Sequence, residues 1–166
     1  MKNIYLVGFM GTGKTVVGKE LAKKLNKDFF DLDDVIEEKE KRKITEIFSQ
    51  DGESYFRKIE RETLLEFSQK KEKIIGCGGG IVLDSQNIQK MKETGVIICL
   101  TASPEVILER TKEYRHRPLL NVEGPLKKIK ELLDFRRPYY ERTDYIIDTS
   151  NLSISEVVDK ISELIR

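Results

Sequence analysis

The chain has 166 residues, a length typical of one domain, and a chain of this size buries about 70% of the surface that it exposes when unfolded. Charged residues make up 36% of the sequence, yet the formal net charge is only +1, which argues against a nucleic-acid-binding surface because such surfaces carry a basic excess. No apolar run approaches the ~20 residues that a membrane-spanning helix needs, so we expect no membrane contact.

The cysteines and the first residues favour a cytoplasmic location. Cys77 and Cys99 each end an apolar run and lack the C-x-x-C spacing of metal and redox motifs. We interpret both as small buried residues in a reducing compartment, with a reactive thiol or a metal ligand as the alternative. The first three residues lead directly into an apolar strand, so we expect no signal peptide.

Predicted strands and helices alternate along the whole chain. We expect strands at 4–7, 28–33, 74–77, 96–100 and 145–148. The first strand is followed by a helix carrying Val17, Leu21 and Leu25, and the second by helices at 34–42, 45–50 and 53–68 with a break at Asp51-Gly52. Further helices are expected at 85–94, from Pro104, from Pro125 and after the fifth strand, where Ser153 and Glu156 cap the last one. This alternation predicts parallel βαβ units in a doubly wound sheet, with ligands beyond the carboxyl ends of the strands.

The first strand runs into a glycine-rich loop. Residues 8–15 read Gly-Phe-Met-Gly-Thr-Gly-Lys-Thr and fit the phosphate-binding pattern G-x-x-x-x-G-K-[ST]. Glycines let the backbone approach a polyphosphate, and amides at the start of the next helix point at the anion. We expect Lys14 to reach the β- and γ-phosphates of ATP and Thr15 to ligate Mg²⁺. A plain glycine turn is the alternative, and the flanking strand and helix argue against it.

Acidic residues end the second predicted strand. Alternation along the strand would place Asp31 and Asp33 on one side, where they could act as metal partners or hydroxyl acceptors beside the nucleotide. The alternative is that they start the next helix, and Asp34 is the better candidate for that capping role.

Three consecutive glycines, Gly78, Gly79 and Gly80, follow the third predicted strand. Many phosphate-loop proteins have a metal-holding acid at this strand end, so here the carboxylate must come from elsewhere, and Asp31 is the nearest candidate. Glycines also let a substrate lie directly on backbone amides. A flexible turn is the alternative.

Two arginines stand on apolar helix faces. Arg57 follows Phe56, and Arg136 comes three residues after Leu133. An inward-facing arginine is costly unless something anionic pairs with it, so we expect this pair to bind a substrate carboxylate in a forked geometry. Internal ion pairs with Asp or Glu are the alternative.

The segment over 112–124 loses helical periodicity and gains basic residues, which is typical of a loop that moves. His116, the only histidine, lies in this segment without an evident partner, and we interpret it as a solvated residue.

In this order the motifs resemble the shikimate kinase family over nearly the whole chain. The matching stretches are the phosphate loop with Val17-Gly18, Phe30-Asp31-Leu32-Asp33 with Ile36-Glu37, Gly52-Glu53, Phe56-Arg57-Lys58-Ile59-Glu60, the glycine triplet, Arg117-Pro118-Leu119-Leu120 and Arg136-Arg137-Pro138-Tyr139-Tyr140. The resemblance implies a three-layer α/β/α fold of the nucleoside-monophosphate-kinase type with a five-stranded parallel sheet. It also implies one domain over 1–166, with a substrate-binding segment at about 31–61 and a short lid at about 112–124.

The resemblance further implies that a monomer transfers the γ-phosphoryl group of ATP to the 3-hydroxyl of shikimate, with Mg²⁺. The implied catalytic residues are Lys14, Asp33 and Arg117. The implied contacts of shikimate are Asp33, Arg57, Gly78, Gly79, Gly80 and Arg136. The implied contacts of ATP are Gly11, Thr12, Gly13, Lys14, Thr15, Val16, Arg110 and Arg117, with Arg110 against the adenine. Thr15 and Asp31 would hold Mg²⁺, Asp31 through water.

The sequence leaves two other functions open. Another small-acceptor kinase, acting on gluconate or a nucleoside monophosphate, would share the phosphate loop. A nucleotide-dependent switch would need a loop ordered by the γ-phosphate and a partner surface. The paired arginines and the glycine triplet favour a small carboxylated polyol, and the balanced charge argues weakly against a switch.

Overall fold

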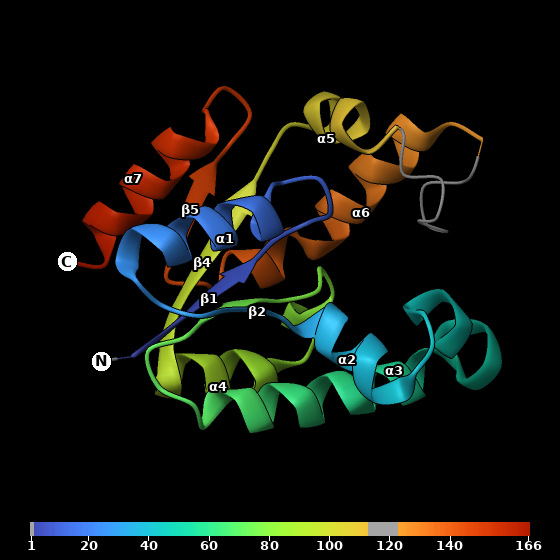
Figure 1. The fold of residues 1–166 in the computed structure, drawn as a ribbon. Helices are drawn as coiled ribbons and strands as arrows, with labels where there is room; N and C mark the ends of the chain where they lie inside the picture. Colours follow the sequence, from blue (N-terminus) through green and yellow to red (C-terminus); the bar gives the residue numbers. More distant parts are fainter. Residues whose placement is uncertain (1, 113–122) are drawn as a thin grey trace.

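The computed structural model describes residues 2–112 and 123–166, in which strands and helices alternate (Figure 1). The strands are β1 (Asn3–Val7), β2 (Phe29–Asp31), β3 (Ile74–Gly76), β4 (Gly95–Thr101) and β5 (Tyr145–Asp148). The helices are α1 (Lys14–Leu25), α2 (Leu32–Glu40), α3 (Ile44–Ser68), α4 (Ser85–Thr94), α5 (Pro104–Thr111), α6 (Pro125–Tyr140) and α7 (Ile154–Leu164), and a 3₁₀ turn covers Ile81–Leu83.

The five strands form one sheet in the order β2-β3-β1-β4-β5, and every neighbouring pair is parallel. This confirms the predicted fold class. Because β1 lies between β3 and β4, Leu6 is paired with Gly76 on one side and with Ile98 on the other. The carboxyl ends of parallel strands share one edge, so the loop after β1 lies beside the glycines that follow β3.

Helices cover both faces of the sheet because side chains alternate along each buried strand. On one face Tyr5 and Val7 pack in a cluster with residues of α3 and α4, and on the other Ile4 and Leu6 pack with α1 and α7. Three layers result, as the family resemblance predicts.

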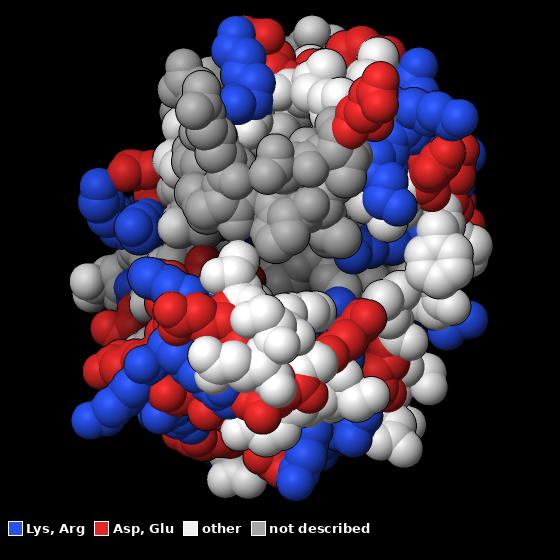
Figure 2. All heavy atoms as spheres, turned by 90° about the vertical axis from the view of Figure 1, so that its right-hand side faces the viewer, with Lys and Arg blue, Asp and Glu red and all other residues white. Residues whose placement is uncertain are grey.

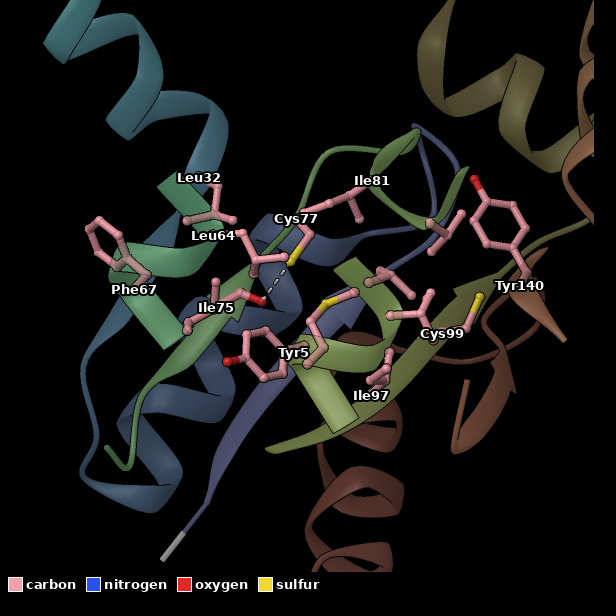
Figure 3. Close-up of a cluster of buried hydrophobic side chains, with 14 residues drawn as sticks. Tyr5, Leu32, Leu64, Phe67, Ile75, Cys77, Ile81, Ile97, Cys99 and Tyr140 are labelled. Atoms are coloured by element: carbon pink, nitrogen blue, oxygen red, sulfur yellow. Dashed lines mark hydrogen bonds between the residues drawn. The ribbon is translucent and has the colours of Figure 1, made fainter. Parts of the chain in front are cut away.

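Both cysteines lie in the cluster on the α3 and α4 side (Figure 3). Burial raises the pKa of the Cys77 thiol well above its ordinary value and that of Cys99 to about 12. The interpretation as buried core residues is confirmed, and such thiols are inert because the nucleophilic thiolate is suppressed.

The predicted break at Asp51-Gly52 is confirmed, since α3 consists of two helical stretches that meet at a kink. Gly52 has φ 82° and ψ 173°, a conformation that favours glycine, within the run assigned to α3. The kink lets Ile47 and Phe56, which flank it, pack together against Ile36 of α2. The α2–α3 unit therefore has a small core of its own beside the sheet.

Acidic and basic side chains are interspersed on the face that carries α2 and α3 (Figure 2). This pattern agrees with solvated helix faces rather than with a surface of one charge. Within residues 2–112 and 123–166, no helix is both long and apolar enough to cross a membrane.

Candidate active site

The loop after β1 has a backbone that only glycine adopts easily at three positions. Gly8, Gly11 and Gly13 have φ values of 138°, 76° and 97°. A Cβ atom on Gly8 would also lie 2.1 Å from the carbonyl oxygen of Leu100, so the loop sits directly against the end of β4. Inside the loop the Thr12 hydroxyl donates to the carbonyl oxygen of Phe9 at 2.7 Å. The glycines of the motif are thus needed for a compact turn leading into α1.

Lys14 and Thr15 begin α1 and point to different parts of the site. The Lys14 ammonium donates to the carbonyl oxygens of Gly8 and Phe9 at 2.6 and 3.0 Å, so it lies across the loop. The Thr15 hydroxyl donates to Oδ2 of Asp31 at 3.0 Å. Val16 follows on the first turn with 48% of its surface exposed.

Asp31, and not Asp34, caps the helix that follows β2. Its Oδ1 accepts hydrogen bonds from the amides of Asp33 and Asp34 at 2.9 and 3.4 Å, while its Oδ2 faces Thr15. The helix therefore starts at Leu32, and the strand predicted over 28–33 ends at Asp31. The capping prediction for Asp34 was wrong, and so was the strand alternation used to pair Asp31 with Asp33. Asp33 reaches the site from the first turn of α2 instead.

Each glycine of the triplet faces a different charged side chain. A Cβ atom on Gly78 would lie 2.9 Å from Oδ1 of Asp33, one on Gly79 would lie 3.0 Å from Nη1 of Arg136, and one on Gly80 would lie 2.4 Å from Nη2 of Arg57. The atom on Gly79 would also lie 3.4 Å from the carbonyl oxygen of Gly8. The structure thus brings a carboxylate from α2 and guanidinium groups from α3 and α6 together beside the phosphate loop.

Arg57 is held by two acids of its own helix. Its Nη1 donates to Oε1 of Glu60 at 2.9 Å, and its Nε and Nη2 each lie 3.4 Å from Oε1 of the largely exposed Glu53. The ion-pair alternative raised from the sequence is therefore present for Arg57. It is compatible with ligand binding, because a guanidinium has five N–H donors and these contacts use three of them, one on each nitrogen.

Glu60 is a member of the site that the sequence reasoning missed. It is 2% exposed, and its Oε2 has no hydrogen-bond partner among the described residues. The pKa of this carboxyl is raised to about 7: burial is the largest cause and the Asp33 carboxylate acts in the same direction, while Arg57 and Arg136 oppose the rise. A signal existed: Glu60 lies four residues after Phe56 and three before Thr63, on the buried stripe of α3.

Arg136 is buried on α6, with 7% of its surface exposed, and its guanidinium lies over the ring of Phe9 at 5.3 Å. It forms no ion pair with an acidic residue in the described part of the chain, in contrast to Arg57. Besides this π contact, Arg136 forms a side-chain hydrogen bond with Tyr140. A guanidinium has five N–H donors, so an anionic ligand could still bind to the others.

Tyr140 also has a role that the sequence did not reveal. Its ring lies in the core cluster with Cys99 (Figure 3). Its hydroxyl, however, donates to the carbonyl oxygen of Gly79 at 2.9 Å. Burial raises the pKa of Tyr140 to about 12, so the donor proton is retained. The hydrogen bond fixes the middle peptide of the triplet.

The remaining predicted residues are Arg110, Arg117 and His116. Arg110 reaches from α5 to the loop that follows β5, where it contacts Thr149, and to the carbonyl oxygen of Gly11. Its predicted contact with adenine stays a prediction. Arg117, His116 and most of the predicted lid fall in 113–122, outside the described residues.

The comparison with known families shows to which family the chain belongs. A family model described as shikimate kinase matches residues 10–166. The chain belongs to the shikimate kinase family. A shikimate kinase of Thermodesulfovibrio yellowstonii is 54% identical over 161 residues, which cover 97% of this chain and 93% of the relative. One of Persephonella marina is 45% identical over 166 residues and matches over 100% of both chains.

Solved structures of the family agree with this fold. The shikimate kinase from Acinetobacter baumannii in complex with shikimate superposes with a TM-score of 0.94 at 39% identity, over 99% of this chain and 93% of that one. The enzyme from Aquifex aeolicus gives a TM-score of 0.83 at 35% identity, over 98% and 95%. The predicted family and fold are confirmed.

Proposed function

We propose that the chain transfers the γ-phosphoryl group of ATP to the 3-hydroxyl of shikimate, giving shikimate 3-phosphate and ADP. One observation carries the proposal: Asp33, Arg57 and Arg136 each face one glycine of the triplet, beside the phosphate loop. Two guanidinium groups suit a carboxylate and one carboxylate suits hydroxyls, which is the chemistry of a small acidic polyol. The Acinetobacter baumannii relative solved with shikimate supports the choice of acceptor.

In this proposal Arg57 and Arg136 bind the carboxylate of shikimate, and amides of the glycine triplet support the ring. Asp33 orients the 3-hydroxyl and accepts its proton as the oxygen attacks the γ-phosphorus. The bond from that phosphorus to the bridging oxygen of ADP breaks, and ADP leaves. Lys14 faces the transferring group. Positioning dominates such catalysis, and well-aligned reactants gain about 7–11 kcal/mol of the barrier.

Thr15 and Asp31 fit a Mg²⁺ site. Their oxygens are hard ligands already in mutual contact, with Oδ2 of Asp31 oriented by the hydrogen bonds that its Oδ1 accepts. Residues 2–112 and 123–166 contain no group of three or more His, Cys, Asp or Glu side chains that could hold a metal. Mg²⁺ does not need such a group, because it is often bound by one carboxylate together with the substrate's phosphates. The ion would neutralise charge on the phosphates.

The remaining features of the proposal come from the family resemblance. Arg117 would meet the charge that develops on the transferring phosphoryl group, from a lid at about 112–124. The substrate-binding segment is about 31–61 of a single domain over 1–166. The protein acts as a cytoplasmic monomer, and the interspersed charges of Figure 2 support small-molecule partners rather than nucleic acid.

A coupled assay of ADP formation tests the proposal. ATP with Mg²⁺ should give rapid ADP formation with shikimate and very little without it. Gluconate and nucleoside monophosphates, offered in its place, should leave the rate near the background. Equal ADP formation with and without shikimate would refute the kinase activity, and a preference for another acceptor would refute the substrate.

A further inference from the structure

Thr149, just after β5, joins three segments that are far apart in the sequence. It is 3% exposed, and its amide donates to the carbonyl oxygen of Thr101 at the end of β4 at 2.8 Å. Its hydroxyl lies 3.0 Å from that oxygen and 3.1 Å from the carbonyl oxygen of Thr12 in the phosphate loop. Arg110 of α5 donates to both the hydroxyl and the carbonyl oxygen of Thr149 at 3.0 Å.

The same arginine also holds the phosphate loop. Nη1 of Arg110 donates to the carbonyl oxygen of Gly11 at 3.2 Å. Two successive carbonyls, those of Gly11 and Thr12, are therefore bound from the β5 and α5 side, by Arg110 and Thr149 respectively. The proposed function gives no role to either hydrogen bond. A contact of Arg110 with adenine would use the flat face of the guanidinium, whereas these hydrogen bonds use its edge.

Holding these carbonyls fixes the direction of two amides. In a trans peptide the C=O and the N–H point in opposite directions, and the described chain has no cis peptide bond. The bound carbonyl of Gly11 therefore turns the amide of Thr12 away from Arg110, and the bound carbonyl of Thr12 turns the amide of Gly13 away from Thr149. Neither amide donates to an acceptor in the described residues, so both are available to a phosphate.

The loop needs such support because its own backbone is permissive. Gly11 and Gly13 flank Thr12, and glycine loses more conformational freedom on ordering than any other residue. The Thr12 hydroxyl already bonds within the loop to Phe9. Gly11 also packs against Thr111 of α5, but among the described residues only Arg110 and Thr149 donate hydrogen bonds to the carbonyls of these two peptides.

We propose that Thr149 and Arg110 are positioning residues for the phosphate loop, which hold the peptides of Gly11 and Thr12 so that two amides face the polyphosphate of the nucleotide. The proposal rests on the proposed ATP-dependent transfer, and it assigns Thr149 a task that does not require adenine. Inorganic tripolyphosphate is the probe that separates the two roles, because it carries the phosphates without the base.

The experiment measures the binding of tripolyphosphate and of ATP, each with Mg²⁺, by titration calorimetry on the full chain. Thr149→Val keeps the shape but removes the hydroxyl, and it should weaken both ligands by a similar factor, roughly tenfold for a buried hydrogen bond. Thr149→Ser should return both affinities close to those of the unsubstituted chain. The KM for shikimate should not change, because the triplet and its charged side chains lie on other elements.

Two further variants keep the test decisive. Arg110→Lys retains the positive charge but loses the forked contact, and it should also weaken tripolyphosphate, even if Thr149→Val folds poorly. Asn151→Ala is the matched control, since Asn151 lies on the same loop and its side chain is exposed. It should bind tripolyphosphate normally.

Unchanged tripolyphosphate affinity in both Thr149→Val and Arg110→Lys would overturn the inference, whatever happens to ATP. An equal loss in Thr149→Ser would also overturn it, because the hydroxyl would not be responsible. An unsubstituted chain that binds neither ligand would instead contradict the proposed function itself.

Discussion

Nη1 of Arg57 donates a hydrogen bond to Oε1 of Glu60 at 2.9 Å, and the two side chains are unequally solvated. The side chain of Arg57 is 25% exposed, whereas that of Glu60 is 2% exposed and has an unbonded oxygen directed toward Gly78. A buried acid beside a second carboxylate, Asp33, is costly to ionise. Glu60 therefore links the geometry of the proposed acceptor site to pH.

We expect the stability of the protein to fall as the pH rises from about 4.5 to about 7. Over this range Glu60 is ionised in the unfolded chain but keeps its proton in the folded one, because burial raises its pKa to about 7 from the ordinary 4.5. The loss amounts to about 3 kcal/mol at most, since one pKa unit corresponds to about 1.4 kcal/mol. Glu60→Gln should remove this part of the dependence in denaturant unfolding measured from pH 4 to 8. Parallel curves for the two proteins would show that Glu60 ionises normally.

Arg57→Ala should weaken shikimate binding and leave ATP binding nearly unchanged. The lost charge-assisted hydrogen bonds correspond to roughly 2 kcal/mol, or about a 30-fold rise in the KM for shikimate. Arg61→Ala is the matched control, because Arg61 lies on the same helix but pairs with Asp84 at 2.9 Å. Steady-state kinetics with each substrate varied separately will show which KM changes. A normal KM for shikimate with a raised KM for ATP would contradict the assignment.

Gly80→Ala should act through Arg57. The backbone at Gly80 has φ −95°, which alanine adopts freely, so the only conflict is the new Cβ atom at 2.4 Å from Nη2 of Arg57. We expect the displaced guanidinium to raise the KM for shikimate roughly tenfold, with kcat and the KM for ATP less affected. In the Arg57→Ala background the same change should have almost no further effect. Additive effects in this double-mutant cycle would mean that Gly80 contacts the substrate independently.

The order of strands and helices was predictable because each element repeats a local pattern. The apolar runs of β1 and β4 and the four-residue spacing on α1 are decided by neighbours in the sequence. The junction between β2 and α2 was not, since the side chain of Asp31 turned the chain into a helix two residues before the expected end of the strand. Capping competes there with strand alternation, and the cap prevails.

The proposed site was only partly predictable for a related reason. Motifs indicated the phosphate loop, the triplet and the two arginines, each from a short stretch of sequence. Tyr140 and Thr149 act through hydrogen bonds to residues 61 and 137 positions away, so no local pattern reveals them. Glu60 could have been recognised from its position in the sequence, but an acid on an apolar stripe is more often solvated than buried.

Asp31→Asn should separate the two proposed roles of this residue, capping α2 and binding Mg²⁺. Asparagine is as good an N-cap as aspartate, so the helix α2 should keep its cap, and the free energy of unfolding should change by less than about 1 kcal/mol. The lost charge should raise the Mg²⁺ concentration needed for half-maximal activity roughly tenfold, because Oδ2 of Asp31 faces Thr15 at the proposed metal site. Asp34→Asn removes the same charge from the exposed side of the same helical turn, and it should leave the Mg²⁺ requirement unchanged. A Mg²⁺ requirement that is equal in both variants would show that Asp31 serves the helix alone.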